Sequence, residues 1–176
     1  MEQRTELSKD ELRHLVPALR SLSDEDLDPF LAMAEVRDVQ DGEELFHEGK
    51  EAHALYFVLE GSVRISRDLP SGQPVDLALL ERGSIIGEVA LLAGSRRTAT
   101  ASAAGHVRTL RVPGEKLYAD YRAGTRYSLV LLMAVARLLA ERLEAMNTRV
   151  AGLLTERTRG TDLDVFRKKI LQDWTI

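Results

Sequence analysis

The chain has 176 residues and a formal net charge of −4, from 24 Lys and Arg against 28 Asp and Glu. Hydrophobic residues make up 44% of it, enough for a globular core, and the absence of cysteine excludes disulfides. The negative net charge argues against a protein that works mainly by binding nucleic-acid phosphates. The first residues lack the features of a secretory signal. The most apolar stretch, residues 127–140, contains Arg137 and is too short to span a bilayer, so we expect a cytoplasmic protein that does not enter a membrane.

Two short helices are predicted at the start of the chain. Ser8 can cap the first, over residues 8–20, because Glu11 follows three residues later as in a capping box. Pro17 should break or kink the last turn of this helix. The second helix covers residues 24–34 and opens with acidic residues, which favour a helix N-terminus.

From residue 36 onward, short β-branched, aromatic and aliphatic runs are separated by glycine turns. The first runs are residues 36–39, 44–47, 54–60, 62–67 and 75–80. Two more strands are predicted over residues 98–103 and 107–112, after an interruption at 87–97. Many short strands at roughly even spacing indicate a sandwich, barrel or roll. We therefore expect a mainly β fold, an eight-stranded antiparallel, jelly-roll-like β-roll with flanking helices.

The pattern becomes helical after residue 114. A short helix is predicted over residues 115–122, and a long one from residue 125 or 126 to about 157, with Gly160 as its stop. The expected organisation has four parts, listed here in chain order: N-terminal helices at 1–34, the β-roll at 35–113, a hinge and long helix at 114–159, and a C-terminal tail at 160–176.

The interruption between the strands carries the most distinctive chemistry. Gly87 permits unusual backbone dihedrals, and the residues after it can form a short helix whose free N–H groups attract an anion. Arg97 and Thr98 lie where the next predicted strand begins, and they can supply a guanidinium and a hydroxyl to the same anion. Glu88, an acceptor when ionised, suits a sugar hydroxyl. The competing interpretation is an ordinary surface ion pair between Glu88 and Arg97.

Residues 86–100, I-G-E-V-A-L-L-A-G-S-R-R-T-A-T, resemble the phosphate-binding cassette of the cyclic-nucleotide-binding domain family, which includes catabolite activator proteins and protein kinase A regulatory subunits. The resemblance extends over roughly residues 24–154. Ile86 replaces the aromatic residue that leads the cassette. The matching positions are Gly87, Glu88, Ala90, Leu91, Arg97, Thr98, Ala99 and Thr100.

The resemblance implies a role for each cassette position. Arg97 would bind the cyclic phosphate and Glu88 the ribose 2′-OH. The remaining expected ligand-binding residues of the cassette, which contribute backbone N–H groups or a close approach, are Gly87, Val89, Ala90, Thr98 and Ala99. The expected ligand is cAMP. cGMP is the alternative, since threonine after the arginine often accompanies cGMP recognition in this family.

The resemblance also implies an apolar base pocket closed by the long helix. Val63, Leu77 and Leu80 would line the pocket, and Met146 and Asn147 would cover the base. An asparagine amide offers both a donor and an acceptor to an adenine edge. The alternative is that Asn147 is a solvent-facing or helix-pairing residue.

The long helix carries an apolar stripe with heptad-like spacing, typical of a coiled-coil seam. Its members are Leu132, Ala136, Leu139, Leu143, Met146, Val150 and Leu153. We expect a parallel homodimer through this stripe, and the alternative packs the stripe onto the chain's own roll. The tail at 160–176 is too short for the helix-turn-helix domain found in related transcription factors, so we expect no direct DNA binding.

The sequence thus predicts a cyclic-nucleotide sensor that signals through its C-terminal helix to a protein partner that the sequence does not identify. The alternatives are a dimeric scaffold of the same fold that does not bind ligand, and a transcription-factor-like regulator without its own DNA-binding domain. The four histidines show no metal-binding spacing, and no catalytic motif is present, so we expect neither a metal site nor an enzyme.

Overall fold

The computed structural model describes residues 7–69 and 71–157, with the backbone alone described for residues 153–157. The chain divides into two compact units, Met1–Val135 and Ala136–Ile176. The boundary falls inside the long helix. The four-part division expected from the sequence stays a prediction, and the tail at 160–176 lies outside the described residues.

The N-terminal helices begin where their caps predict. α1 (Lys9–Leu15) starts after Ser8, whose hydroxyl accepts from the Glu11 amide while the Glu11 carboxylate accepts from the Ser8 amide. The predicted helix over 8–20 is shorter than expected, because Pro17 cannot donate to the helical ladder and opens the 3-10 turn η1 (Pro17–Ser21) instead. α2 (Asp24–Met33) confirms the second prediction.

The antiparallel β-roll is confirmed, with fewer and longer strands than the sequence predicts. The strands are β1 (Glu35–Val39), β2 (Glu44–Phe46), β3 (Ala54–Asp68), β4 (Pro74–Glu81), β5 (Ile85–Ile86) and β6 (Thr100–Pro113). β3 and β6 each merge two predicted runs. They pair with each other along most of their length, with register shifts on both sides of Glu60 that let the strands bend without ending.

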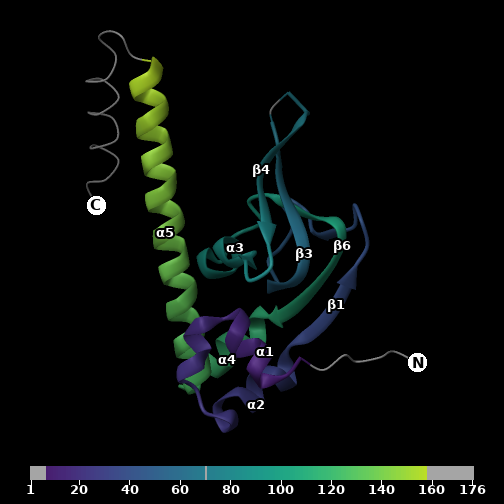
Figure 1. Ribbon diagram of the computed structural model, residues 1–176, viewed down its shortest axis with the longest axis vertical. Coiled ribbons are helices and arrows are strands. Elements are labelled where there is room, and N and C mark those ends of the chain that lie inside the picture. Colours follow the sequence, from purple (N-terminus) through teal and green to yellow (C-terminus); the bar gives the residue numbers. More distant parts are fainter. Residues whose placement is uncertain (1–6, 70, 158–176) are drawn as a thin grey trace. The chain divides into compact units, whose positions relative to one another are not determined.

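The sheet order is β1-β6-β3-β4, with β2 paired to β6 and β5 paired to β3. Figure 1 shows α1, α2 and α4 gathered at one end of the roll, and the β3–β4 hairpin extending from the other end. At the helical end, Phe30 of α2 makes edge contacts with Phe57 of β3 and with Tyr127, at ring-centroid distances of 6.4 and 5.7 Å. These buried rings join α2, the sheet and the start of the long helix.

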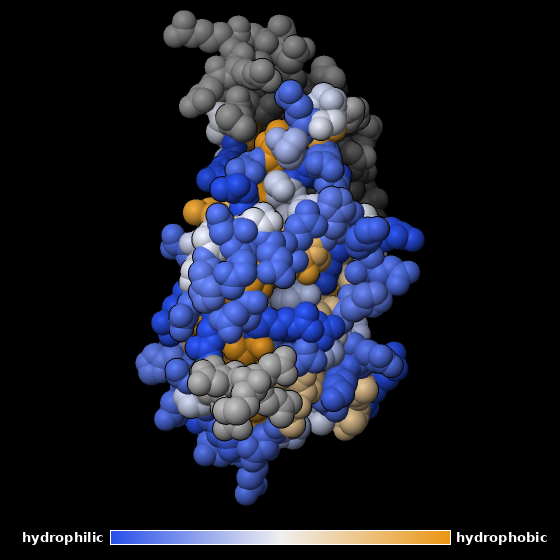
Figure 2. All heavy atoms as spheres, turned by 90° about the vertical axis from the view of Figure 1, so that its right-hand side faces the viewer, coloured by the Kyte–Doolittle hydropathy of each residue, from blue (hydrophilic) through white to orange (hydrophobic). Residues whose placement is uncertain are grey.

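The remaining helices follow the predicted order. α3 (Glu88–Ala93) interrupts the strands, α4 (Gly114–Arg122) follows β6, and α5 (Arg126–Arg157) is the long helix. None of the described helices combines the length and the apolar character that a membrane crossing requires. The side of the roll where β1 lies is mainly hydrophilic, with scattered apolar side chains (Figure 2).

Glycines in the left-handed region bound α3 at both ends, Gly87 with φ 83° and Gly94 with φ 60°. A Cβ atom at Gly87 would lie 2.4 Å from Nη1 of Arg97, whereas one at Gly94 would meet nothing within 4 Å. Both positions therefore favour glycine for their backbone, but only Gly87 also leaves room for the buried Arg97 side chain.

Gly87→Ala should lower the free energy of unfolding by about 2–4 kcal/mol, because the new methyl group adds displacement of Arg97 to the backbone strain. The matched variant Gly94→Ala carries the strain alone and should lose about 1–2 kcal/mol. Denaturant unfolding measures both values. Equal losses in the two variants would show that Gly87 makes no special room for Arg97.

Candidate functional site

The site is built around the side chain of Arg97, which is only 4% exposed. Its Nη1 donates to the carbonyl oxygen of Gly87 at 2.8 Å, and its Nη2 donates to the carbonyl oxygen of Ala54 at 2.6 Å. Its Nε is buried and has no hydrogen-bond partner among the residues that the structure describes. A buried polar group without a partner costs free energy, so this arrangement suits a site whose remaining acceptor comes from a ligand.

Glu88 provides a carboxylate in the same region. It is the first residue of α3 and is only 2% exposed. Burial lowers the pKa of Arg97, while the nearby Tyr56 and Glu88 raise it. The alternative of a surface ion pair between Glu88 and Arg97 is therefore wrong, because both side chains are buried.

The turn between β2 and β3 fixes the backbone at Arg97. The Gly49 amide donates to the Arg97 carbonyl and the Arg97 amide donates to the Lys50 carbonyl, each at 2.8 Å. Arg96 points elsewhere, since its Nη1 donates to the Gly49 carbonyl at 2.9 Å and its side chain is exposed. The structure thus buries Arg97 and exposes Arg96, while the role of Arg97 as the phosphate ligand stays a prediction.

The other cassette residues surround this centre. Ala90 is buried in α3, whereas Val89 is exposed on it. Thr98 and Ala99 lie in a bend, because β6 begins only at Thr100. The predicted strand over 98–103 therefore starts two residues late, and Thr98, expected on the strand, is an exposed bend residue next to Arg97.

Two of the three predicted base-pocket residues meet in one apolar cluster. Val63 is fully buried there and Leu80 packs against its edge; the other buried members are Val39, Val58, Ile86, Ala101, Ala103 and Val107. Leu77 lies outside the cluster and is 54% exposed. It sits at a register shift of β4, where Ile65 pairs with Ala78 and Ser66 with Asp76. A pocket role for Leu77 stays a prediction.

The predicted lid residues belong to the second compact unit. Met146 is 57% exposed and Asn147 is also exposed on α5. The contact of Met146 and Asn147 with a bound base stays a prediction.

Sequence reasoning missed several groups that hold Arg97. The centre of the Phe46 ring lies 4.0 Å from the Arg97 Cζ, and the Tyr56 ring packs against Phe46 in a tilted arrangement with ring centroids 5.9 Å apart. The Ala54 carbonyl and the turn at 48–51 were missed as well. The glycine turn was visible in the sequence, but nothing there shows that it pairs with Arg97 about fifty residues later.

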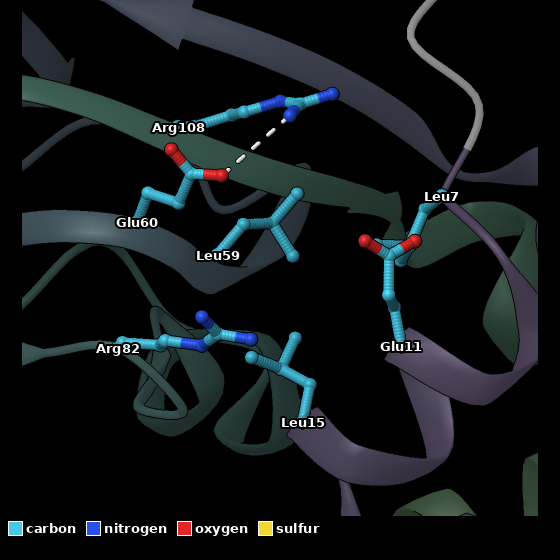
Figure 3. Close-up of a pocket in the computed structure, with 7 residues that line it drawn as sticks. All are labelled: Leu7, Glu11, Leu15, Leu59, Glu60, Arg82 and Arg108. Atoms are coloured by element: carbon cyan, nitrogen blue, oxygen red, sulfur yellow. Dashed lines mark ion pairs between the residues drawn. The ribbon is translucent and has the colours of Figure 1, made fainter.

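A small pocket lies between α1 and the strands (Figure 3), away from Arg97. It is lined by Leu7, Glu11, Leu15, Leu59, Glu60, Arg82 and Arg108. Its volume is about 50 Å³, far smaller than the several hundred Å³ usual for a nucleotide-sized ligand. Glu60 and Arg108 already pair across it at 3.7 Å. None of the predicted site residues lines this pocket.

The arrangement around Arg97 suits one kind of ligand. A buried guanidinium with an unused donor fits a phosphate, a buried carboxylate fits a hydroxyl, and the adjoining apolar cluster fits a flat ring. Within the described part of the chain, no group of three or more potential metal-ligating side chains could hold a metal ion.

Residues 36–121 match the family model of the cyclic nucleotide-binding domain. The chain is 33% identical over 143 residues to the cyclic AMP receptor protein of Thermus thermophilus, a match that covers 81% of this chain and 64% of that protein. The chain thus spans less than two thirds of this relative's length.

Solved structures are also similar to this chain. The N-terminal domain of a Streptomyces coelicolor transcriptional regulator is 31% identical, with a TM-score of 0.61 over 74% of this chain and 96% of that one. A cyclic nucleotide-binding domain from Methylobacillus flagellatus shares the fold at 20% identity, with a TM-score of 0.72 over 88% of this chain and 86% of that one. With its cassette intact around Arg97 and its roll matched in sequence and in structure, the chain belongs to the cyclic-nucleotide-binding domain family.

Proposed function

We propose that this protein binds a cyclic nucleotide, with cAMP as the expected ligand, and passes the binding signal to its C-terminal helix. The observation that carries the proposal is the buried guanidinium of Arg97, whose Nε has no hydrogen-bond partner in the described part of the chain. Burying a cation is costly unless its charge is compensated, and a phosphate in the site compensates it.

The donor count of Arg97 supports phosphate binding. A guanidinium carries five N–H groups. One N–H of Nη1 and one N–H of Nη2 each donate to a backbone carbonyl. The Nε–H and the remaining Nη–H groups are left for two parallel hydrogen bonds to a phosphate.

The rest of the nucleotide follows from the neighbours of Arg97. The carboxylate of Glu88 accepts the ribose 2′-OH, and the base lies against Val63 and Leu80, with Leu77, Met146 and Asn147 as further contacts. The name of the Thermus relative, a cyclic AMP receptor protein, favours adenine. The exposed hydroxyl of Thr98 keeps cGMP as the second candidate.

The contacts of α3 provide a route for the signal. The Tyr118 hydroxyl of α4 donates to the Leu91 carbonyl of α3 at 2.7 Å. A Cβ atom at Gly114, the first residue of α4, would lie 2.3 Å from Leu91 Cδ1, so the two helices are in close contact. A shift of α3 on binding phosphate must therefore move α4, and through it the start of α5.

The start of α5 is itself tied to α4. The Tyr127 hydroxyl donates to the Asp120 carboxylate, and burial together with this hydrogen bond raises the pKa of Tyr127. Thr125 donates to the Asp120 carbonyl at 3.1 Å. The hinge between the roll and the long helix thus consists of α4 and the start of α5. These hydrogen bonds join the two helices across Gly124.

A second copy of the chain is the proposed partner of the apolar stripe on α5. The buried residues of α5 in the first unit are Tyr127, Ser128, Leu131 and Val135. The stripe begins at Leu132, one turn after Ser128, and continues into the second unit. Within the second unit, its members Leu143, Met146 and Val150 are exposed and keep the heptad-like spacing of a coiled-coil seam.

Arg97→Lys should weaken nucleotide binding by about 2–4 kcal/mol, because a point charge replaces a two-pronged donor. Glu88→Gln should cost about 1 kcal/mol for the ribonucleotide and almost nothing for its 2′-deoxy analogue. Calorimetric titration of each variant measures these losses. An unchanged Kd in Arg97→Lys removes Arg97 from the site, and equal losses for both ligands in Glu88→Gln refute the ribose role.

Nucleotide should slow amide hydrogen exchange in two separate segments, residues 86–100 and residues 140–150, because α3 tightens on the phosphate and α5 then closes. Tyr118→Phe keeps the ring but removes the hydrogen bond to Leu91. It should keep the protection at 86–100 and reduce that at 140–150. Wild-type protection confined to residues 86–100 would mean that the protein binds nucleotide without this relay.

Leu143→Glu combined with Val150→Glu should convert a dimer to a monomer, since unpaired carboxylates cannot be buried in an apolar seam. Ala145→Glu with Thr148→Glu, which places the same charges on exposed positions away from the stripe, is the matched control and should stay dimeric. Sedimentation equilibrium distinguishes the two. A wild-type protein that is monomeric at tens of micromolar would contradict the proposal.

A further inference from the structure

We infer that Phe46 is the positioning residue of the phosphate-binding arginine, holding the Arg97 guanidinium plane in one orientation with and without ligand. This inference rests on the proposed function. It assigns to Phe46, a residue outside the cassette, control over the geometry of the phosphate contact.

The contact is close and places the guanidinium carbon over the ring. The Arg97 Cζ lies 4.0 Å from the centre of the Phe46 ring. Phe46 Cε1 would be 3.2 Å from a Cβ atom placed on Gly87, so the ring also packs against the glycine whose carbonyl accepts from Arg97. Phe46 therefore touches both the cation and the backbone to which the cation is anchored.

A β-bulge in β2 aims Phe46 at this place. Glu44 pairs with Ser102 of β6 and Phe46 with the next residue, Ala101, so Leu45 is an extra residue in β2. Without the bulge, Phe46 would share the outward face of Glu44, because residues two apart in a strand point the same way. With the bulge, Phe46 faces the interior together with the fully buried Ala101.

Tyr56 fixes the ring in turn. Its ring lies 5.9 Å from that of Phe46, and its hydroxyl donates to the Leu45 carbonyl at 3.4 Å. Tyr56 is buried on β3 and pairs there with Ile86, directly before the cassette glycine. The support of Phe46 thus comes from elements that frame the site on two sides.

The direction of the contact explains why it persists on binding. The hydrogen bonds of a guanidinium lie in its plane, so a phosphate approaches in that plane the N–H groups that the carbonyls of Gly87 and Ala54 leave unused. A ring placed over the guanidinium carbon does not compete with the phosphate for these donors. Phe46 is therefore the side chain that keeps Arg97 oriented while the phosphate joins its in-plane partners.

The test compares Phe46→Leu, which keeps apolar bulk but removes the ring, with Phe46→Tyr, which keeps the ring. Phe46→Leu should weaken cAMP binding about tenfold, and Phe46→Tyr should stay within about threefold of wild type. Leu27→Ala removes fully buried packing from α2, outside this apolar cluster, and serves as the stability control. It should lower the melting temperature yet bind within about threefold of wild type.

A second readout does not depend on ligand. The Nε–H proton of Arg97 should show an upfield ring-current shift by NMR in the nucleotide-free protein, a shift that Phe46→Leu abolishes and Phe46→Tyr retains. The inference is overturned if wild type binds cAMP but Phe46→Leu binds equally well, or if the Arg97 signal is unaffected by Phe46→Leu; the proposed function then stands. If wild type binds neither cAMP nor cGMP while the Arg97 shift is present, the proposed function fails, and the assignment of Phe46 to phosphate binding falls with it.

Discussion

The burial of one cation governs the local structure of this protein. Placing the Arg97 guanidinium inside the roll is favourable only if its donors and its charge are compensated nearby. Two backbone carbonyls, one aromatic face and a buried carboxylate supply most of that compensation. Among the described residues they leave one donor over, at Nε, and the proposed binding of a phosphate rests on that donor.

Several irregular features of the fold become intelligible around this constraint. Gly87 adopts a left-handed conformation where any side chain would strike Arg97. The bulge at Leu45 turns an aromatic ring inward, and the β2–β3 turn is bonded to the backbone of Arg97 from both directions. α3 is thereby held between the site on one side and α4 on the other, which is the position that a relay requires.

Much of the fold and of the candidate site could be predicted from the sequence, because these features depend on local sequence signals. The capping box at Ser8, the glycine before α3 and the spacing from Glu88 to Arg97 each depend on neighbouring residues. The features that could not be predicted depend on pairing between distant segments. The contact of Phe46 with Arg97 depends on the register of β2 on β6. The merging of predicted strands into β3 and β6 depends on bulges that a short sequence pattern does not predict.

The most direct test of the account is calorimetric titration of the wild-type protein with cAMP, cGMP and a cyclic dinucleotide. The account predicts one site per chain for a cyclic mononucleotide, with cAMP tighter than cGMP and no saturable binding of the dinucleotide. The absence of binding heat for both mononucleotides, in a protein shown to be folded, would contradict it and leave the buried Arg97 as a purely structural cation.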